Sequence, residues 1–199
     1  KAGVCLSTLG PGATNLVTGA AFAQLGGMPM VMITGQKPVK SSKQANFQIL
    51  DVVEMMGPLT KKSKSLISGN EIAFEIRRSF RAAESERPGV AHLELPEDIA
   101  QEEVQNFKLL PTKTLQEVEA PQEVLKELAD KLQKSKCPII VLGSESNRKS
   151  CCHLITSLIH DFEIPFVSTQ MGKGVVDEFS PYYIGNATVS SGSIVHEAL

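Results

Sequence analysis

A glycine-rich turn near the start of the chain contains the first residues whose types and spacing could support chemistry. It reads Gly10-Pro11-Gly12-Ala13-Thr14-Asn15 and follows a short apolar run. Ligands of open α/β sheets bind where a buried strand ends and a helix begins, because free backbone N–H groups face outward there. A tight bend, in which the glycines only relieve steric clashes, is the stronger interpretation on spacing alone. No charged side chain occurs in residues 2–36, so a neutral ring is favoured over a phosphate as any ligand.

A second candidate site combines two uncharged amides with an aromatic ring. Gln36 opens a polar loop, and Phe47-Gln48 follows that loop. Together these side chains could line a pocket near the end of the preceding strand. Without other information we favour the alternative, in which Phe47 packs at the start of a helix and the glutamines are solvated. Lys61 is by itself typical of a surface charge.

The elements that must position these residues follow a strand-helix-strand pattern. Apolar runs bounded by glycine predict strands over Gly3–Ser7 and Met28–Thr34, with a helix over Ala13–Leu25 between them. Strands that are apolar on both faces are typical of parallel sheets with right-handed crossovers. Further along the chain the pattern predicts a helix over 47–56, a strand over 64–67, a helix capped by Asn70 and a strand over 89–96.

A change in composition predicts two domains. Residues 97–120 become rich in Glu, Gln, Lys and Thr, so we place a domain over 1–98, a linker over 99–120 and a second domain over 121–199. In the second domain we expect helices over 122–133 and 148–162, strands over 138–142 and 165–168, and a last helix from about Ser191. No strand is expected after residue 168, which we interpret as a second sheet cut open. The predicted class is α/β, with an open parallel sheet followed by part of a second, Rossmann-like domain.

Composition and charge exclude several partners. The formal net charge is -2, so no positive field would gather nucleic acid or anionic lipid. No run approaches the roughly 20 apolar residues that a membrane-spanning helix requires. The four cysteines have neither metal-ligand nor disulfide-framework spacing, which favours a reducing cytoplasm.

Five segments, taken together, resemble a known enzyme family. The segments are Val4–Gly19, Pro29–Gln36, Phe47-Gln48, Pro58–Lys61 and Arg87–Asp98. In this order and spacing they resemble the pyrimidine-binding domain of thiamine diphosphate enzymes, most closely the large subunit of acetolactate synthase. The second half is similar to the start of that family's central domain.

The resemblance implies roles for the candidate residues. Gly10, Pro11, Gly12, Asn15 and Gln36 would contribute to cofactor binding, with Pro11 and Asn15 facing the cofactor ring of a partner subunit. Phe47 and Gln48 would be the catalytic pair bordering the substrate. Lys61 would lie at the mouth of the substrate channel and attract anionic 2-oxo acids. The implied cofactors are thiamine diphosphate and Mg²⁺.

Other family features are missing or altered. The family's activating glutamate lies upstream of residue 3, and its Gly-Asp-Gly magnesium motif occurs nowhere in this sequence. We therefore expect no metal ligands in this chain, and expect the chain alone to be inactive. The family's triple glycine is replaced by Gly143-Ser144-Glu145, and a negative charge at Glu145 beside a pyrophosphate argues against bound FAD.

The implied activity is a carboligase of branched-chain amino acid biosynthesis, which decarboxylates pyruvate and joins the remaining unit to a second 2-oxo acid. We expect a homodimer or a dimer of dimers, and a regulatory subunit stays open. Three alternatives remain. Another thiamine diphosphate enzyme would be of the glyoxylate carboligase, sulfoacetaldehyde acetyltransferase or 2-hydroxyacyl-CoA lyase type. A non-catalytic binding module is the second, and a nucleotide-binding α/β protein is the weakest, because the sequence lacks a Gly-x-Gly-x-x-Gly motif after its first strand.

Overall fold

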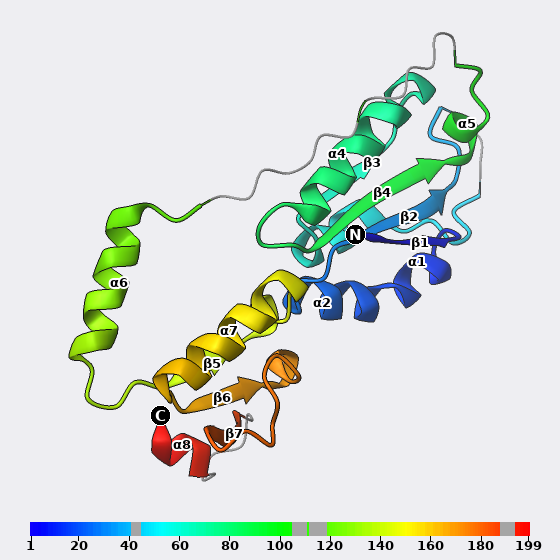
Figure 1. The fold of residues 1–199 in the computed structure, drawn as a ribbon. Helices are drawn as coiled ribbons and strands as arrows, with labels where there is room; N and C mark the ends of the chain where they lie inside the picture. Colours follow the sequence, from blue (N-terminus) through cyan, green and yellow to red (C-terminus); the bar gives the residue numbers. More distant parts are fainter. Residues whose placement is uncertain (41–44, 105–110, 112–118, 188–193) are drawn as a thin grey trace. The chain divides into compact units, whose positions relative to one another are not determined.

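The chain forms two compact units, Lys1–Gln116 and Glu117–Leu199, in a computed structural model that describes residues 1–40, 45–104, 111, 119–187 and 194–199. Each unit is α/β and contains one parallel sheet (Figure 1), which confirms the predicted fold class. The division between the units falls within the range 99–120, for which we predict a linker. Residues 105–110 and 112–118 of that range lie outside the described residues.

The first unit is built on a four-stranded sheet, here called sheet 1, in the order β1-β2-β4-β3. All neighbouring strands are parallel. The strands are β1 (Gly3–Ser7), β2 (Met30–Gln36), β3 (Lys62–Ser65) and β4 (Val90–Pro96). Because the strands are parallel, the ends marked by Ser7, Gln36, Ser65 and Pro96 meet at one edge, which we call the carboxyl edge of sheet 1.

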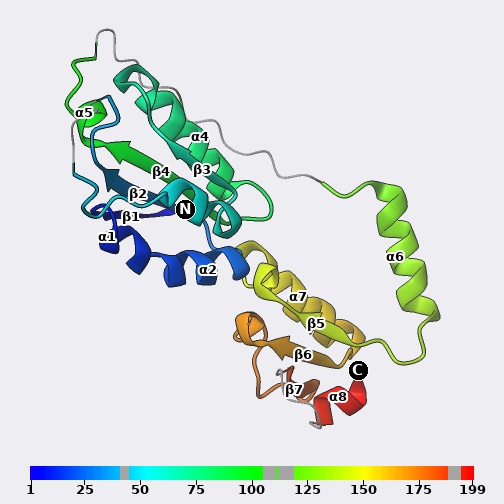
Figure 2. The same cartoon turned by 180° about the vertical axis from the view of Figure 1, so that it is seen from behind.

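Helices cover both faces of sheet 1 (Figures 1 and 2). One face carries α1 (Pro11–Asn15), α2 (Val17–Leu25) and α3 (Val52–Met56). The other carries α4 (Ile72–Glu84) and, after β4, the short α5 (Glu97–Ala100). The 3₁₀ turns η1 (Gly57–Leu59) and η2 (Gly69–Glu71) precede β3 and α4, respectively. The core on the α2 side includes Ala20, Met32 and Met56, and the core on the α4 side includes Val31, Ala83 and Leu93.

Several predicted boundaries in the first unit are wrong. The helix expected over 13–25 begins at Pro11 and is interrupted at Leu16, which separates α1 from α2. Only the second half of the helix expected over 47–56 is helical, because Asp51 caps α3 through a hydrogen bond from Glu54 N (2.8 Å). The strand expected over 64–67 is β3, two residues earlier. Ser68, not Asn70, accepts the capping hydrogen bond before α4, from Asn70 N at 3.3 Å.

The second unit contains a three-stranded parallel sheet in the order β5-β6-β7. Its strands are β5 (Ile140–Leu142), β6 (Phe166–Thr169) and β7 (Tyr183–Ala187). Its helices are α6 (Gln122–Lys134), α7 (Lys149–Phe162) and α8 (Ile194–Ala198), with 3₁₀ turns η3 (Ser144–Ser146) and η4 (Gln170–Gly172).

Strand β7 contradicts the prediction that no strand follows residue 168. Gly185 and Asn186 interrupt its apolar pattern, and both residue types are disfavoured in strands. The predicted helix start at Ser191 lies outside the described residues. In the part of the chain that the structure describes, no helix combines the length and apolar character needed to cross a membrane.

Candidate functional site

The carboxyl edge of sheet 1 brings together the glycine turn and the Phe47-Gln48 pair, which lie far apart in the sequence. Gly10 has φ +54°, and a Cβ atom built on it would lie 2.6 Å from Gln48 O and 2.9 Å from Gln48 Cβ. These distances are far below van der Waals contact, so only glycine fits between the turn and Gln48. The glycine therefore has a tertiary role that a simple tight bend does not require.

Gln48 itself adopts an unusual backbone conformation. Its φ is +62°, in the left-handed region that non-glycine residues rarely occupy. Gln48 is exposed, and the Phe47 side chain beside it is 69% exposed, so burial does not account for this conformation. Strained backbone at an exposed loop is found preferentially at functional sites. The Phe47-Gln48 pair thus presents an aromatic ring and an uncharged amide to solvent.

The remaining turn residues contribute close packing and exposed surface. A Cβ on Gly12 would lie 2.6 Å from Thr8 Cγ2, so this glycine lets α1 fold back on the end of β1. Pro11 occupies the first turn of α1, where its missing N–H costs no hydrogen bond. Pro11 and Asn15 are both exposed. All four turn residues predicted from the sequence are therefore near the same edge as Gln48.

Gln36 ends β2 and connects three segments of this edge. Its Nε2 donates to Leu50 O (3.1 Å) and to Glu94 Oε2 (2.9 Å), and its Oε1 accepts from Lys37 N (2.9 Å). A pocket of about 530 Å³ opens here, with walls that include Gln36, Leu50, Asp51, Ser65 and Glu94. A second pocket of about 400 Å³, lined in part by Thr8 and Leu95, lies at the carboxyl ends of β1, β2 and β4.

A buried histidine lies one row deeper in sheet 1. His92 is fully buried, and its ring nitrogens lie 2.9 Å from Thr34 Oγ1 and 2.8 Å from Ser63 Oγ. The Ser63 hydroxyl donates its one proton to Val53 O (3.0 Å), so it must accept from His92 Nδ1–H, and Thr34 must donate to Nε2. Burial lowers the pKa of His92 to about 4, which keeps the ring neutral.

Lys61 is the one candidate residue that the structure does not bring to this edge. It directly precedes β3, and Lys61 N donates to Val90 O at the start of β4, so it lies at the amino edge of sheet 1. Its Nζ donates to Ser85 O (2.7 Å), Ser85 Oγ (2.9 Å) and Arg87 O (2.8 Å). Burial lowers the pKa of Lys61, and the charge of Glu86 opposes this shift. Within this chain, its position gives no support to a role at a channel mouth.

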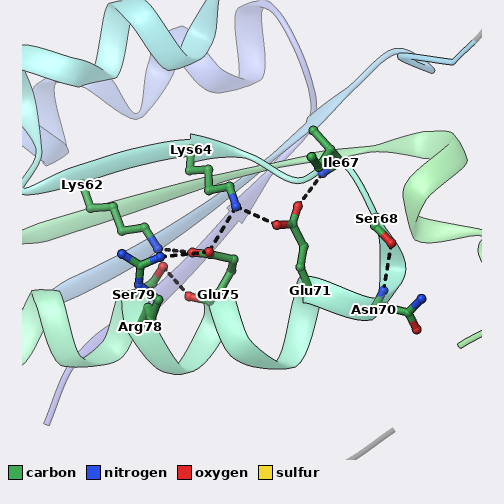
Figure 3. A network of polar contacts seen from close by, with 9 residues as sticks. All are labelled: Lys62, Lys64, Ile67, Ser68, Asn70, Glu71, Glu75, Arg78 and Ser79. Carbon is green, nitrogen blue, oxygen red and sulfur yellow. Dashed lines mark hydrogen bonds and ion pairs between the residues drawn. The ribbon is translucent and has the colours of Figure 1, made fainter. Parts of the chain in front are cut away.

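A second polar cluster lies at the flank between β3 and α4 (Figure 3), and we call it the flank network. Glu75, whose side chain is 3% exposed, forms ion pairs with Lys62, Lys64 (3.1 Å) and Arg78 (3.2 Å). Lys64 also pairs with Glu71 at 2.6 Å. Burial would raise the pKa of Glu75, but hydrogen bonds from Lys62 and Lys64 outweigh it and lower the pKa. Opposite charges thus neutralise one another inside the cluster.

Two polar residues of β4, Glu94 at the carboxyl edge and His92 one row deeper, were not among the residues predicted from the sequence. Both interrupt the apolar run of β4, and a charged or titratable residue in a strand otherwise buried on both faces is the signal that could have identified them. In the second unit, Glu145 lies exposed in η3, directly after β5. Among the described residues no group of three or more His, Cys, Asp or Glu side chains could hold a metal ion.

Two family models match the chain. Residues 1–55 match the N-terminal TPP-binding domain of thiamine pyrophosphate enzymes, and residues 125–199 match the central domain of these enzymes. The first match includes both the glycine turn and Phe47-Gln48. Thiamine pyrophosphate is another name for thiamine diphosphate.

Similar proteins share most of the chain's length. The chain is 34% identical over 191 residues to a protein from Methanocaldococcus jannaschii called probable acetolactate synthase large subunit, covering 93% of this chain and 32% of that protein. It is 33% identical over 203 residues to the acetolactate synthase large subunit of Lactococcus lactis subsp. lactis, covering 100% of this chain and 35% of that protein. The chain therefore spans about a third of the length of these relatives.

Proposed function

Because the chain belongs to the thiamine pyrophosphate enzyme family, with an N-terminal and a central domain, we propose that it is part of an acetolactate synthase-like carboligase. The proposed enzyme decarboxylates pyruvate and joins the remaining two-carbon unit to a second 2-oxo acid. One observation carries the proposal beyond the names of the relatives. Gly10 and Gln48, from two separate motifs of the family resemblance, are in direct contact at the carboxyl edge of a parallel sheet, where α/β enzymes bind their ligands.

The residues at this edge fit one end of thiamine diphosphate. Pro11 and Phe47 offer exposed apolar surface, and Gln48 offers an amide, which together suit a flat, uncharged heteroaromatic ring. When bound, the cofactor supplies the nucleophilic carbon and the electron sink that decarboxylation of a 2-oxo acid requires. The sequence contains no Gly-Asp-Gly, the family's motif for magnesium and diphosphate, so we propose that Mg²⁺ and the diphosphate are held by residues outside it.

Within this chain, Gln48 is the proposed catalytic residue. Its exposed amide can donate a hydrogen bond to the carboxylate or carbonyl oxygen of the 2-oxo acid. An amide does not ionise near neutral pH and is a very weak acid, so it can stabilise developing negative charge without protonating a carbanion as a carboxylic acid or imidazolium would. Phe47 would border the substrate and exclude water. Gly10 and Gly12 let the turn approach closely enough for Pro11 and Asn15 to face the cofactor.

The family resemblance also supports a proposal for the assembly and location of the enzyme. We propose a homodimer or a dimer of dimers in which the exposed turn faces a partner subunit's cofactor, working in the cytoplasm in branched-chain amino acid biosynthesis. The exposed Glu145 beside the end of β5 would oppose a pyrophosphate electrostatically, so FAD is not part of the proposal.

The direct test is turnover by the full-length protein that contains this chain. With thiamine diphosphate and Mg²⁺ present, pyruvate should yield carbon dioxide and acetolactate. Glyoxylate, sulfoacetaldehyde and a 2-hydroxyacyl-CoA should be turned over much more slowly in parallel assays. Rapid turnover of one of these three substrates without acetolactate formation would assign the protein to another branch of the family and refute the proposal.

A further inference from the structure

We propose that Gln36 and Glu94 form a brace that fixes the segment carrying Gln48, so that Gln36 acts as a positioning residue and not as a cofactor ligand. The consequence for catalysis rests on the proposed function, whereas the brace is a property of the chain itself. Gln36 then has a different role from the cofactor binding that the family resemblance implies, and Glu94 serves as its anchor.

Both N–H groups of the Gln36 side-chain amide already donate hydrogen bonds within the chain. A glutamine amide has two N–H donors and one carbonyl oxygen. The two hydrogen bonds from Nε2, to Leu50 O and Glu94 Oε2, use both donors. Lys37 N donates to Oε1. Gln36 thus has no N–H group left to donate to a ligand, and its rotamer is fixed from three sides.

Glu94 is the anchored end of the brace. Glu94 lies on β4, which is between β2 and β3, and is only 6% exposed. Its backbone pairs with Thr34 on one side and with Ser65 on the other, so the sheet fixes the position of its Cα. A hydrogen bond to an ionised carboxylate is about twice as strong as one between neutral groups. Glu94 therefore holds the Gln36 amide in the orientation that directs the other N–H toward Leu50.

Among the described residues, few hydrogen bonds hold the segment 46–52, although Val52 at its end is buried in the core. Gln48 is exposed and has φ +62°, yet it packs against Gly10 more closely than any side chain there would permit. Ile49 N donates to Asn46 O at a long 3.3 Å, and Val52 N donates to Leu50 O at 3.0 Å. The hydrogen bond from Gln36 Nε2 to Leu50 O joins this segment to sheet 1 at a point two residues after Gln48. A strained conformation persists only where surrounding contacts determine it.

The brace therefore predicts what happens when the tie to Leu50 is cut and the rest of the network is kept. In Gln36→Glu/Glu94→Gln the two side chains are exchanged, so the amide at 94 can donate to the carboxylate at 36, and Lys37 N keeps an acceptor. The carboxylate has no N–H for Leu50 O. Glu94→Gln alone leaves Gln36 with both of its donors and an amide oxygen at 94 to bind. The double variant and Glu94→Gln differ only at position 36, so a comparison between them measures the effect of losing the hydrogen bond to Leu50 O.

The test measures hydrogen exchange and kinetics on the full-length protein. In the exchanged double variant, backbone amides in the peptide covering 46–52 should exchange at least tenfold faster than in wild type, and kcat for pyruvate should fall at least tenfold while the melting temperature changes by only a few degrees. In Glu94→Gln the exchange rates of this peptide should stay within about threefold of wild type. Gln101→Met, at an exposed glutamine after α5, should leave exchange and kcat unchanged.

Each contrary outcome overturns a stated part of the inference. Wild-type exchange rates over 46–52 in the double variant would show that Gln36 does not hold the segment. Faster exchange with unchanged kcat, in a protein that turns over pyruvate, would show that the brace does not position Gln48. If the wild-type protein does not turn over pyruvate, the proposed function fails, and the exchange rates still decide whether the brace exists.

Discussion

The flank network and the carboxyl edge of sheet 1 both contain a nearly buried glutamate, but the two glutamates have different partners. Glu75 in the flank network is surrounded by Lys62, Lys64 and Arg78. Glu94 at the carboxyl edge accepts a hydrogen bond from the uncharged amide of Gln36, beside an open pocket. The first arrangement neutralises charge and ties β3 to α4. The second orients an amide and, through it, an exposed and strained segment.

We propose from this comparison that the flank network serves stability and the carboxyl edge serves function. Removing a member of the flank network should cost folding free energy and leave the chemistry of the edge unchanged. Removing an exposed side chain at the carboxyl edge should lower activity and leave the free energy of unfolding nearly unchanged. The following predictions test this separation, from the largest expected effect to the smallest.

The largest effect is expected from Glu75→Gln. The substitution keeps the shape of the side chain but leaves Lys62, which is 17% exposed, without its carboxylate. Removing one partner of a buried ion pair typically destabilises a protein by about 3 to 5 kcal/mol. Thermal and urea unfolding of the protein should show this loss. Glu127→Gln, in the exposed α6 pair of Glu127 with Lys131, is the matched control and should cost less than about 1 kcal/mol. An equal loss of unfolding free energy in both variants would show that the flank network stabilises the protein no more than an ordinary surface ion pair.

Gln48→Ala should have the opposite profile. Loss of one donor that acts on developing charge costs about 2.7 to 4 kcal/mol of barrier, or roughly 100- to 1000-fold in kcat/KM for pyruvate. Because Gln48 is exposed, the free energy of unfolding should change by less than about 1 kcal/mol. Steady-state kinetics and melting curves of the full-length variant provide the measurement. Wild-type turnover with a lowered melting temperature would make Gln48 a structural residue.

His92 should make the stability of the first unit depend on pH. Its pKa falls from an ordinary 6.5 to about 4 in the folded chain, so between these values the unfolded chain binds more protons. Stability should therefore be lost as pH decreases from 6.5 to 4, by about 3 kcal/mol in total, and this contribution should not change further below pH 4. Unfolding at a series of pH values should show a weaker dependence in His92→Gln. His153→Gln, at an exposed position, should keep the wild-type dependence, and identical curves for all three proteins would contradict the role of His92.

The smallest effect is expected from Asp51→Ala, which removes the cap of α3. Loss of a capping side chain costs about 1 kcal/mol. Asp51→Asn keeps an oxygen that can accept from Glu54 N and should be nearly neutral in thermal unfolding. A loss of several kcal/mol in Asp51→Ala would mean that the edge contributes to stability as strongly as the flank network, and the proposed separation would be wrong.

The sequence predicts the apolar strands of sheet 1 and the glycine turn well because those features are local. Glycine-bounded apolar runs correctly predict the buried β2 and β4, and the glycine turn between β1 and α1 follows from adjacent residues. The conformation of Phe47-Gln48 could not be predicted, because the left-handed Gln48 is explained by its contact with Gly10 and by the bond from Gln36 to Leu50, both of which join segments distant in sequence. The periodicity alone predicts a continuous helix there.

The pairing of β3 with β4 accounts for the differences at β3 and Lys61. β3 has the sequence Lys-Ser-Lys-Ser, which has no apolar pattern, and its lysines are paired by glutamates on η2 and α4. The pairing of Lys62 with Ala91, at the start of β4, places Lys61 at the amino edge, far along the strands from Gln48. Neither feature is visible before the strands are paired.

The carboxyl edge of sheet 1 is the proposed ligand site, and hydrogen exchange of the full-length protein with and without thiamine diphosphate and Mg²⁺ tests this assignment most directly. We expect the cofactor to slow exchange in peptides covering 9–15 and 46–52 and to leave peptides covering 62–65 and 71–79 unchanged. Slower exchange confined to the β3–α4 flank, with the glycine turn and the Gln48 segment unaffected by a saturating cofactor concentration, would contradict the account.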